Sequence, residues 1–366
     1  MKFIDEFRGE RTARLLADAI RKALAVRDSA GGRPLTLMEV CGTHTMAVAK
    51  YGIRGLLPAT LRLVSGPGCP VCVTPHGWMD HAIALARRPG TTVCAFGDMM
   101  RVPGSTSSLE RERAKGADVR ILASTLEALS LAEANPGRQV VFLGVGFETT
   151  IPTVAVSILE AKSRGLANYS VLSGHKLMPP ALEALSSGDP RPDGYLCPGH
   201  VSAVLGSEVY EAIVRDHGIG CVIAGFEPLD ILQAILMLAR QAAEGRPRVE
   251  NPYSRAVTKE GNVRARRILS QVFEPKDDEW RGLGRIRSSG LAIRPEYAEH
   301  DAALRLPVEV EPTQEPAGCV CGSVLRGAVT PPECGLFGST CTPDNPVGAC
   351  MVSAEGTCAA YFRYGT

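Results

Sequence analysis

The sequence lacks any hydrophobic run long enough to cross a membrane and any excess of charge of one sign. Its longest apolar stretch, ILQAILMLA at 231–239, falls far short of the roughly 20 residues that span a bilayer. Forty lysines and arginines balance thirty-nine aspartates and glutamates, and no basic stripe carries interleaved aromatic residues. These absences argue against a membrane protein and against nucleic acid as the main partner.

Common targeting and nucleotide-binding motifs are also missing. The N-terminal segment MKFIDEFRGERTARLLADAI alternates charged and apolar residues and has no unbroken apolar region of a secretion signal. There is no Walker-type loop, and GVGFET at 144–149 has only a superficial likeness to the dinucleotide fingerprint. We therefore expect a cytoplasmic protein. In that reducing compartment its twelve cysteines indicate metal or redox chemistry rather than structural disulfides.

The length and the alternation of apolar runs predict the fold class. A chain of 366 residues exceeds one ordinary core and suggests two or three domains. Short apolar runs end in polar motifs with glycine or proline, and helix-like patterns follow most of them. The expected strands lie at 35–40, 61–64, 91–96, 139–145, 169–172, 194–197 and 220–225. The clearest helices are expected at 9–27, 76–88, 150–164 and 229–243.

This alternation predicts an α/β protein with parallel sheets, and two parallel-sheet domains that face each other fit the length better than one large sheet. Ligands of such sheets bind beyond the carboxyl ends of the strands, so the seven motifs after the strands are expected to line the functional edges. After about residue 270 the pattern changes, and the Pro- and Glu-containing linker at 305–318 leads into a Cys-, Gly- and Pro-rich tail. Such a tail needs a bound metal to hold it together.

The tail carries six cysteines and no histidine within forty residues, at 319, 321, 334, 341, 350 and 358. An all-sulfur donor set suits an iron–sulfur cluster or zinc, but the paired C-x2-C knuckles of zinc ribbons are absent. The run Cys334, Cys341, Cys350 and Cys358, spaced by six, eight and seven residues, can wrap a [4Fe–4S] cluster. Cys319 and Cys321 compete for the same places or form a dithiol beside them. Redox-active disulfides are the alternative for the whole tail.

A second thiol centre is expected near the N-terminus. Cys41 ends a predicted strand and is followed by His44, while Cys69 and Cys72 lie in GPGCPVC after the next strand. If the two loops face each other, three thiols and an imidazole converge, and a helix N-terminus or a nearby cation would activate the thiolates. The C-x2-C pair is then a reversible disulfide or a metal grip, and the alternative is a tight turn whose cysteines pack inward.

The remaining cysteines and two histidines have simpler interpretations. Cys94 and Cys221 lie within β-rich runs and are expected in the core, and packing is also favoured for Cys197. His175 and His200 follow predicted strands, so they are expected either to line a site or to make loop hydrogen bonds.

Taken together, these motifs resemble the HypD family of hydrogenase maturation factors. The resemblance extends over essentially the whole chain and keeps the motifs in order. It rests on CGTHT at 41–45, GPGCPVCVTP at 66–75, FGDMMRVPG at 96–104, GFETT at 146–150, SGHKLMPPA at 173–181, PGHVS at 198–202, GFEPLD at 225–230, NPYSRAVTKEGN at 251–262 and CGLFGSTCTPDNPVGACMVSAEGTCAAY at 334–361.

The resemblance implies a cytoplasmic scaffold on which the Fe(CN)2(CO) part of the [NiFe]-hydrogenase active site is assembled. The small chaperone HypC would be its partner, and HypE, working with HypF, would supply the cyanide. Cys41 would be the iron-binding thiolate, completed by a thiolate from HypC, with His44 alongside. Cys69 and Cys72 would form a redox-active pair near the same cleft.

The resemblance also implies a [4Fe–4S] cluster held by the tail, with Cys334, Cys341, Cys350 and Cys358 as ligands, in a domain to which both chain ends contribute. The expected division is a first α/β domain from 30–58 and 149–270 and a second from 59–148. The cluster domain would comprise 1–25 and 271–366.

The residues agree with this chemistry, because soft thiolates suit an iron that carries cyanide and carbonyl, and a cluster with a dithiol can relay electrons to it. The main alternative is an iron–sulfur thiol–disulfide reductase that acts on a partner protein. A third hypothesis is a zinc-stabilised binding module. No stand-alone reaction is assigned to the chain.

Overall fold

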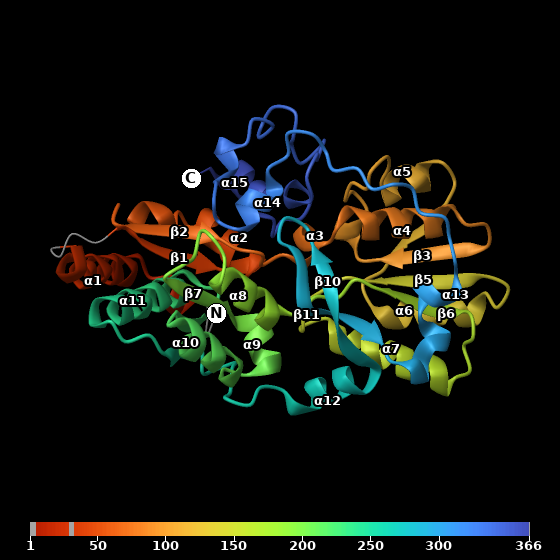
Figure 1. Cartoon of the computed structure of the whole chain (residues 1–366), viewed down its shortest axis with the longest axis horizontal. Coiled ribbons are helices and arrows are strands. Elements are labelled where there is room, and N and C mark those ends of the chain that lie inside the picture. The colour runs from red at the N-terminus through yellow and green to blue at the C-terminus, as the bar shows by residue number, and fades with distance from the viewer. Residues whose placement is uncertain (1–4, 29–32, 366) are drawn as a thin grey trace.

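The computed structural model describes residues 5–28 and 33–365. Two lobes lie side by side, a β-hairpin lies between them, and the C-terminal tail packs above their junction (Figure 1). Each lobe is built on a parallel sheet, which confirms the predicted α/β class. Within the described residues, no helix is both long and apolar enough to cross a bilayer.

The first lobe contains a five-stranded parallel sheet. Its strands are, in spatial order, β2 (Leu61–Ser65), β1 (Leu35–Glu39), β7 (Gly194–Pro198), β8 (Gly220–Ala224) and β9 (Val249–Glu250). One face packs against α1 (Glu10–Asp28), α2 (Gly42–Lys50) and α11 (Pro228–Glu244). The other face packs against α8 (Met178–Ser186), α9 (Gly199–Leu205) and α10 (Glu211–His217).

The second lobe contains a four-stranded parallel sheet. Its strands are, in order, β4 (Asp118–Ile121), β3 (Thr91–Ala95), β5 (Gln139–Gly144) and β6 (Tyr169–Ser173). Helices α4 (His76–Arg87) and α5 (Leu109–Ala114) cover one face. Helices α6 (Thr125–Ala134), α7 (Ile151–Ser163) and α12 (Val263–Val272) cover the other, together with the antiparallel hairpin β10 (Phe273–Trp280) and β11 (Gly284–Ile293).

The short helices belong to the connections and the tail. They are α3 (Pro70–Val73), α13 (Ala302–Arg305), α14 (Cys321–Leu325) and α15 (Thr357–Tyr364). One continuous set of buried residues links the two sheets and the tail, because it contains Tyr195 of β7, Val93 of β3 and Cys350 of the tail. The two lobes and the tail therefore share a core. This shared core fixes the loops of the first lobe relative to the loops of the second lobe.

All seven predicted strands and all four predicted helices are present, within one or two residues of the expected bounds. Two parallel edge strands were not predicted. β4 is partly polar and β9 has only two residues, so neither forms an apolar run in the sequence. The hairpin was also missed. Its first strand, FEPKDDEW, is rich in charge because most of its side chains face solvent, so it lacks the apolar pattern of a core strand.

The sheets divide the chain differently from the expected domain ranges. β2, expected within 59–148, pairs with β1 in the first lobe, and β6, expected within 149–270, pairs with β5 in the second. Consecutive parallel strands joined by a helix tend to be neighbours in one sheet, which keeps β1 with β2 and β5 with β6. Helix α1 packs on α11 in the first lobe, where Ile20 and Leu24 are fully buried.

The hairpin turn joins the second lobe to the tail. Trp280, at the end of β10, is buried and stacks on Phe147, with the ring centroids 5.9 Å apart. Gly282 follows with φ +78°, and its backbone touches α14 so closely that a Cβ here would lie 2.1 Å from the Cα of Gly322. Only glycine tolerates both the left-handed conformation and this approach.

Alanine substitutions in this turn should separate the two requirements. Gly284 also has a positive φ, +73°, but a Cβ there would meet nothing within 4 Å. Gly284→Ala should therefore cost only backbone strain, about 1 kcal/mol. Gly282→Ala should cost that strain plus overlap with Gly322, about 1–3 kcal/mol more, and should lower the melting temperature clearly further. Equal melting temperatures for the two variants would contradict the close packing of the turn on α14.

Candidate functional site

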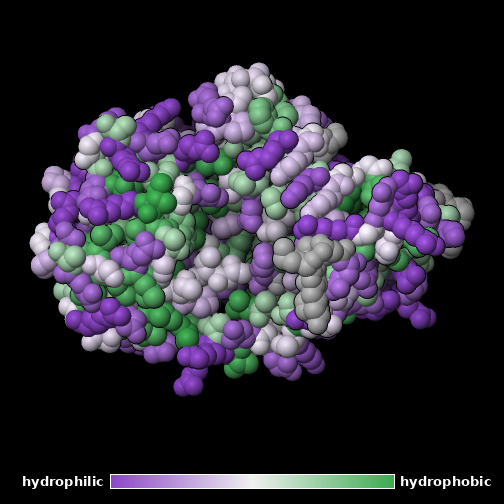
Figure 2. Space-filling view, turned by 180° about the vertical axis from the view of Figure 1, so that it is seen from behind, coloured by the Kyte–Doolittle hydropathy of each residue, from purple (hydrophilic) through white to green (hydrophobic). Residues whose placement is uncertain are grey.

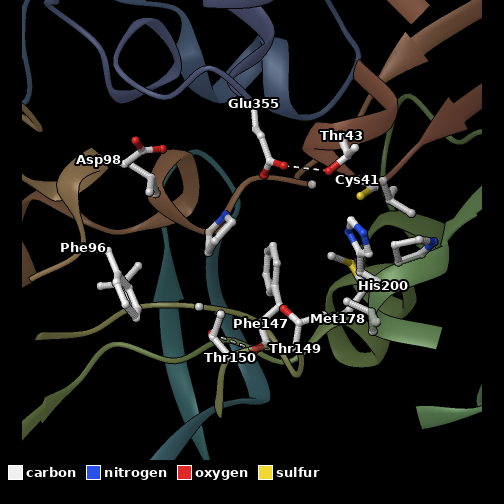
Figure 3. Close-up of a pocket in the computed structure, with 18 of the residues that line it drawn as sticks. Cys41, Thr43, Phe96, Asp98, Phe147, Thr149, Thr150, Met178, His200 and Glu355 are labelled. Atoms are coloured by element: carbon white, nitrogen blue, oxygen red, sulfur yellow. Dashed lines mark hydrogen bonds between the residues drawn. The ribbon is translucent and has the colours of Figure 1, made fainter. Parts of the chain in front are cut away.

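A cavity of about 310 Å³ lies where the loops of the two lobes meet. Seen from behind, the molecule is hollowed between the lobes (Figure 2), and Figure 3 shows the side chains that surround the cavity. It is lined by parts of the loops 40–43, 68–71, 96–99, 145–150 and 198–201, with Met178 and the tail residue Glu355. Six of the seven motifs predicted to lie at the strand ends thus contribute to it; only GFEPLD does not.

Cys41 lies at the N-terminus of α2, two residues after β1 ends, and its side chain lines the cavity (Figure 3). The loop that carries Cys69 runs directly against it, because the amide of Gly42 donates to the carbonyl of Gly68 at 3.1 Å. A Cβ on Gly68 would lie 2.3 Å from the backbone nitrogen of Cys41. The expected proximity of the two thiol-bearing loops is therefore present, and it depends on a glycine.

The surroundings of Cys41 favour the neutral thiol. Burial, followed by the carboxylates of Glu355 and Glu39, raises the pKa of Cys41 to about 12. Glu39 is itself buried, and burial raises its pKa to about 7, although the hydroxyl of Thr45 donates to it at 2.7 Å. A soft cation that binds Cys41 must displace this proton, so ligation and deprotonation are coupled at this position.

The tail forms the roof of the cavity. The hydroxyl of Thr43 donates to Glu355 Oε1 at 2.6 Å, which joins the tail to α2 of the first lobe (Figure 3). The hydroxyl of Ser353 donates to Asp98 Oδ2 at 2.7 Å, which joins it to the second lobe. Glu355 was not among the predicted site residues. Its position between two cysteines of the tail, in CMVSAEGTC, was the available signal.

His44, expected beside Cys41 in the site, is buried behind the cavity and does not line it. Its Nε2 donates to the carbonyls of Ala224 and Gly225, at 3.2 and 3.0 Å, and burial lowers its pKa to about 4. Its ring contacts Phe226. His200 stacks on the same phenylalanine, with centroids 4.0 Å apart, and it is this histidine that faces the cavity (Figure 3).

Cys69 directly precedes the single turn of α3, and Cys72 lies within it. Cys69 is the N-cap, and its sulfur accepts the amide of Cys72 at 3.4 Å. Both side chains are almost completely buried, with 3% and 0% exposure. The residues around them, Gly68, Pro70 and Val71, line the cavity, whereas the thiol of Cys72 points to the tail, where it donates to the carbonyl of Ala349 at 4.0 Å. The pair lies between the cavity and the tail.

The tail sulfurs gather against this pair. Cys350 is hydrogen-bonded with Cys72, Cys321 and Cys358, and these three thiols lower its pKa. Cys319 is hydrogen-bonded with Cys321, and Cys341 lies close to both. Cys334 is half-buried and takes no part in these contacts among the described residues. We refer to Cys72, Cys319, Cys321, Cys341, Cys350 and Cys358 as the sulfur group.

The sulfur group fits a soft metal cluster. All its donors are thiols, most are buried, and hydrogen bonding already favours one thiolate among them. Gly348 leaves room beside them, since a Cβ there would lie 2.5 Å from the sulfur of Cys321 and 2.8 Å from that of Cys319. Among the described residues no three or more Cys, His, Asp or Glu side chains are arranged to hold a single metal ion.

The three remaining cysteines are core residues, as predicted. Cys94, Cys197 and Cys221 lie within β3, β7 and β8 and are fully buried. His175 is also fully buried, and its Nδ1 lies 3.2 Å from the hydroxyl of Ser173, so it makes a loop contact and does not line the cavity.

Glu148 lies between two cavity-lining residues but points into the core. Its Oε1 accepts the amide of Met178 at 2.9 Å, and its Oε2 is buried without a hydrogen-bond partner. Burial raises the pKa of Glu148 to about 7. Since the pKa of the folded state exceeds that of the unfolded chain, the carboxyl favours folding at low pH, and this contribution is lost as the pH rises through about 7.

Comparison with known proteins gives one consistent result. The model of the HypD family, described as "Hydrogenase formation hypA family", matches residues 12–365. The chain is 50% identical to the hydrogenase maturation factor HypD of Azotobacter vinelandii, over all of this chain and 97% of that protein. It is 46% identical to the HypD of Cupriavidus necator and 43% identical to that of Escherichia coli K12, over all of this chain and 97% and 98% of theirs.

The buried carboxyl of Glu148 predicts a pH-dependent effect of its removal. Glu148→Gln should raise the melting temperature at about pH 8, where the wild-type side chain is charged, and change it little at about pH 4, where that side chain is mostly protonated in both the folded and the unfolded chain. The displacement of the pKa corresponds to about 3 kcal/mol at most. Glu110→Gln, at an exposed position, is the control, and its effect on the melting temperature should be the same at both pH values. An equal effect of Glu148→Gln at both pH values would show that the carboxyl keeps its ordinary pKa in the folded protein, which would contradict the shift caused by burial.

Proposed function

The chain belongs to the HypD family of hydrogenase maturation factors, and from this premise we propose that it is the cytoplasmic scaffold on which the Fe(CN)2(CO) unit of [NiFe]-hydrogenase is assembled. The substrate iron would bind in the cavity between the lobes. The observation that carries the proposal is the placement of one buried thiol, Cys41, in a cavity formed by the strand ends of two parallel sheets.

The composition of the cavity supports a partner that completes the iron site. In the described part of the chain, Cys41 is the one cysteine that lines the cavity. Its other polar side chains, such as Glu355 and His200, offer oxygen and nitrogen donors. An iron that carries cyanide and carbonyl is best held by soft thiolates. A second thiolate must then come from outside, and we assign it to a HypC-type small chaperone, with cyanide delivered by HypE and HypF.

The exposed rim of the cavity supports docking of such a partner. Thr149 and His200 line the cavity and are exposed at its edge. The roof at Glu355 and the buried position of Cys41 close the opposite side. A protein that places its own cysteine at the rim would seal the site from water, which protects a reactive iron intermediate.

For the tail we propose a small iron–sulfur domain with a resident [4Fe–4S] cluster. Cys334, Cys341, Cys350 and Cys358 are the proposed ligands, and Cys319 and Cys321 are the competitors for these places. The all-sulfur donor set and the burial of Cys341, Cys350 and Cys358 support a cluster of this kind. When bound, the cluster would supply single electrons.

We propose that Cys69 and Cys72 pass reducing equivalents between the tail and the cavity. When the two thiols close to a disulfide they release two electrons and two protons, and they recover both on reduction. Their position supports this role, since Cys72 contacts Cys350 on one side and Gly68 and Val71 line the cavity on the other. His44 holds the backbone at the end of β8 and, through Phe226, the ring of His200.

The burial of the C-x2-C pair distinguishes this role from that of a thiol–disulfide reductase acting on partner proteins. Such a reductase must present its attacking sulfur to a foreign disulfide. Cys69 and Cys72 are 3% and 0% exposed, and the tail covers them. The arrangement therefore favours internal electron transfer within a scaffold.

Substitution of Cys41 should separate the two metal stations. Cys41→Ala, co-purified without oxygen with its small chaperone, should lose the cyanide and carbonyl infrared bands because the iron loses its thiolate. The iron and the visible absorption of the tail cluster should remain. Cys94→Ala, which removes a buried core thiol that neither lines the cavity nor belongs to the sulfur group, is the matched control and should keep both signals. Loss of tail iron in Cys41→Ala would refute this division of roles.

The ligand set can be decided by comparing two single substitutions. Cys334→Ala should abolish the visible absorption and reduce the iron content by the amount of one cluster, because a cuboidal cluster needs four thiolates. Cys321→Ala should retain the cluster. The reverse result would place Cys321 in the ligand set in place of Cys334, in line with its contacts to Cys350 and Cys358.

A further inference from the structure

The turn of the β10–β11 hairpin carries an arginine into the interior beside the sulfur group. The amide of Arg281 donates to the carbonyl of Val73, at the end of α3, at 2.8 Å. The next residue, Gly282, packs on Gly322 beside Cys321. The side chain of Arg281 is only 6% exposed. The turn therefore inserts a fixed positive charge between the dithiol helix and the cysteines of the tail.

Two of the three guanidinium nitrogens have neutral partners. Nε donates to the carbonyl of Thr74 at 2.8 Å, and Nη1 donates to Nε2 of His76 at 2.9 Å. Burial, followed by the charge of Arg281, lowers the pKa of His76 to about 4, so the imidazole is a neutral acceptor at physiological pH. These two bonds orient the guanidinium without neutralising it.

The third nitrogen, Nη2, is buried and has no hydrogen-bond partner, and no carboxylate of the described residues pairs with the guanidinium. Burial lowers the pKa of Arg281, and the groups that oppose this are the thiols of Cys321, Cys350, Cys72 and Cys319. An unpaired buried charge is costly, and a donor without an acceptor adds to that cost. Among the described residues, the groups that favour the charged guanidinium most strongly are therefore these thiols.

We infer that Arg281 is the fixed counter-charge of the sulfur group, with Nη2 donating to sulfur, and that it raises the reduction potential of the cluster bound there. The inference rests on the cluster assigned to the tail under the proposed function. Reduction adds one negative charge to the cluster, so a nearby cation stabilises the reduced form more than the oxidised form. Charge and hydrogen bonds to sulfur are among the factors that set such potentials.

Arg281 is in this sense a positioning residue, because it acts through sulfur and does not contact the substrate iron in the cavity. Its charge lies close to Cys350, a proposed cluster ligand, and to Cys72 of the dithiol, which contact each other. Through this one side chain, the hairpin of the second lobe would regulate how readily the tail accepts electrons.

The experiment measures the midpoint potential of the cluster in the full-length chain, together with its iron content and melting temperature. Arg281→Gln removes the charge, and Arg281→Lys keeps the charge but loses the planar fork. Arg326→Gln is the control, since Arg326 lies on the same side of the tail but binds the carbonyl of Gly282 and the hydroxyl of Ser323. Wild-type protein is purified anaerobically and analysed in parallel.

Arg281→Gln should weaken one-electron reduction at least tenfold, a fall of about 59 mV, whereas Arg281→Lys and Arg326→Gln should stay near the wild type. If Arg281→Gln loses its iron, retention of iron in Arg281→Lys still supports the counter-charge. An unshifted potential in Arg281→Gln would overturn the inference that Arg281 is the counter-charge. Loss of iron in both Arg281 variants, with iron retained in Arg326→Gln, would also overturn it, because Arg281 would then have a purely structural role. A wild-type chain without iron would refute the proposed cluster itself, and the inference with it.

Discussion

The contact between the C-terminal tail and the first turns of α2 and α3 is the constraint on which both thiol stations depend. Gly42 has no Cβ, which lets Glu355 reach Thr43 and close the cavity over Cys41. A few residues earlier, Cys350 meets Cys72. One short segment of the tail thus sets the roof of the cavity and the position of the sulfur group. Its path over both helices relates the two stations to each other (Figure 1).

Burial gives these thiols their chemistry. The thiol of Cys41 is kept protonated by desolvation and by two carboxylates, so under the proposed function it would become a strong ligand once a metal replaced the proton. In the sulfur group burial likewise raises the pKa of Cys72 and Cys341, but the neighbouring thiols lower the pKa of Cys350, and the guanidinium of Arg281 lies beside the group as a positive charge. The protein therefore combines a single protonated thiol, Cys41, in the cavity with a separate group of thiols whose composition suits a resident cluster.

Much of the fold could be predicted from the sequence, because the strand cores are continuous apolar runs and the helices are amphipathic. What could not be predicted is which strands share a sheet. The run at 61–64 gives no sign that it pairs with β1, and the run at 169–172 gives none that it pairs with β5. The charged hairpin β10–β11 escaped notice because it is stabilised by contacts such as that of Trp280 with Phe147, which no local pattern reveals.

The sequence by itself determined the chemical inventory: the number and spacing of the thiols, the motifs at the strand ends and the family. Residue type and local order suffice for these. The tertiary structure alone decided that His44 lies behind the cavity while His200 faces it, that Glu355 forms the roof, and that Arg281 lies beside the sulfur group. Side chains distant in the chain meet only after the sheets pair and the glycines allow close approach, and these long-range contacts leave no periodic trace in the sequence.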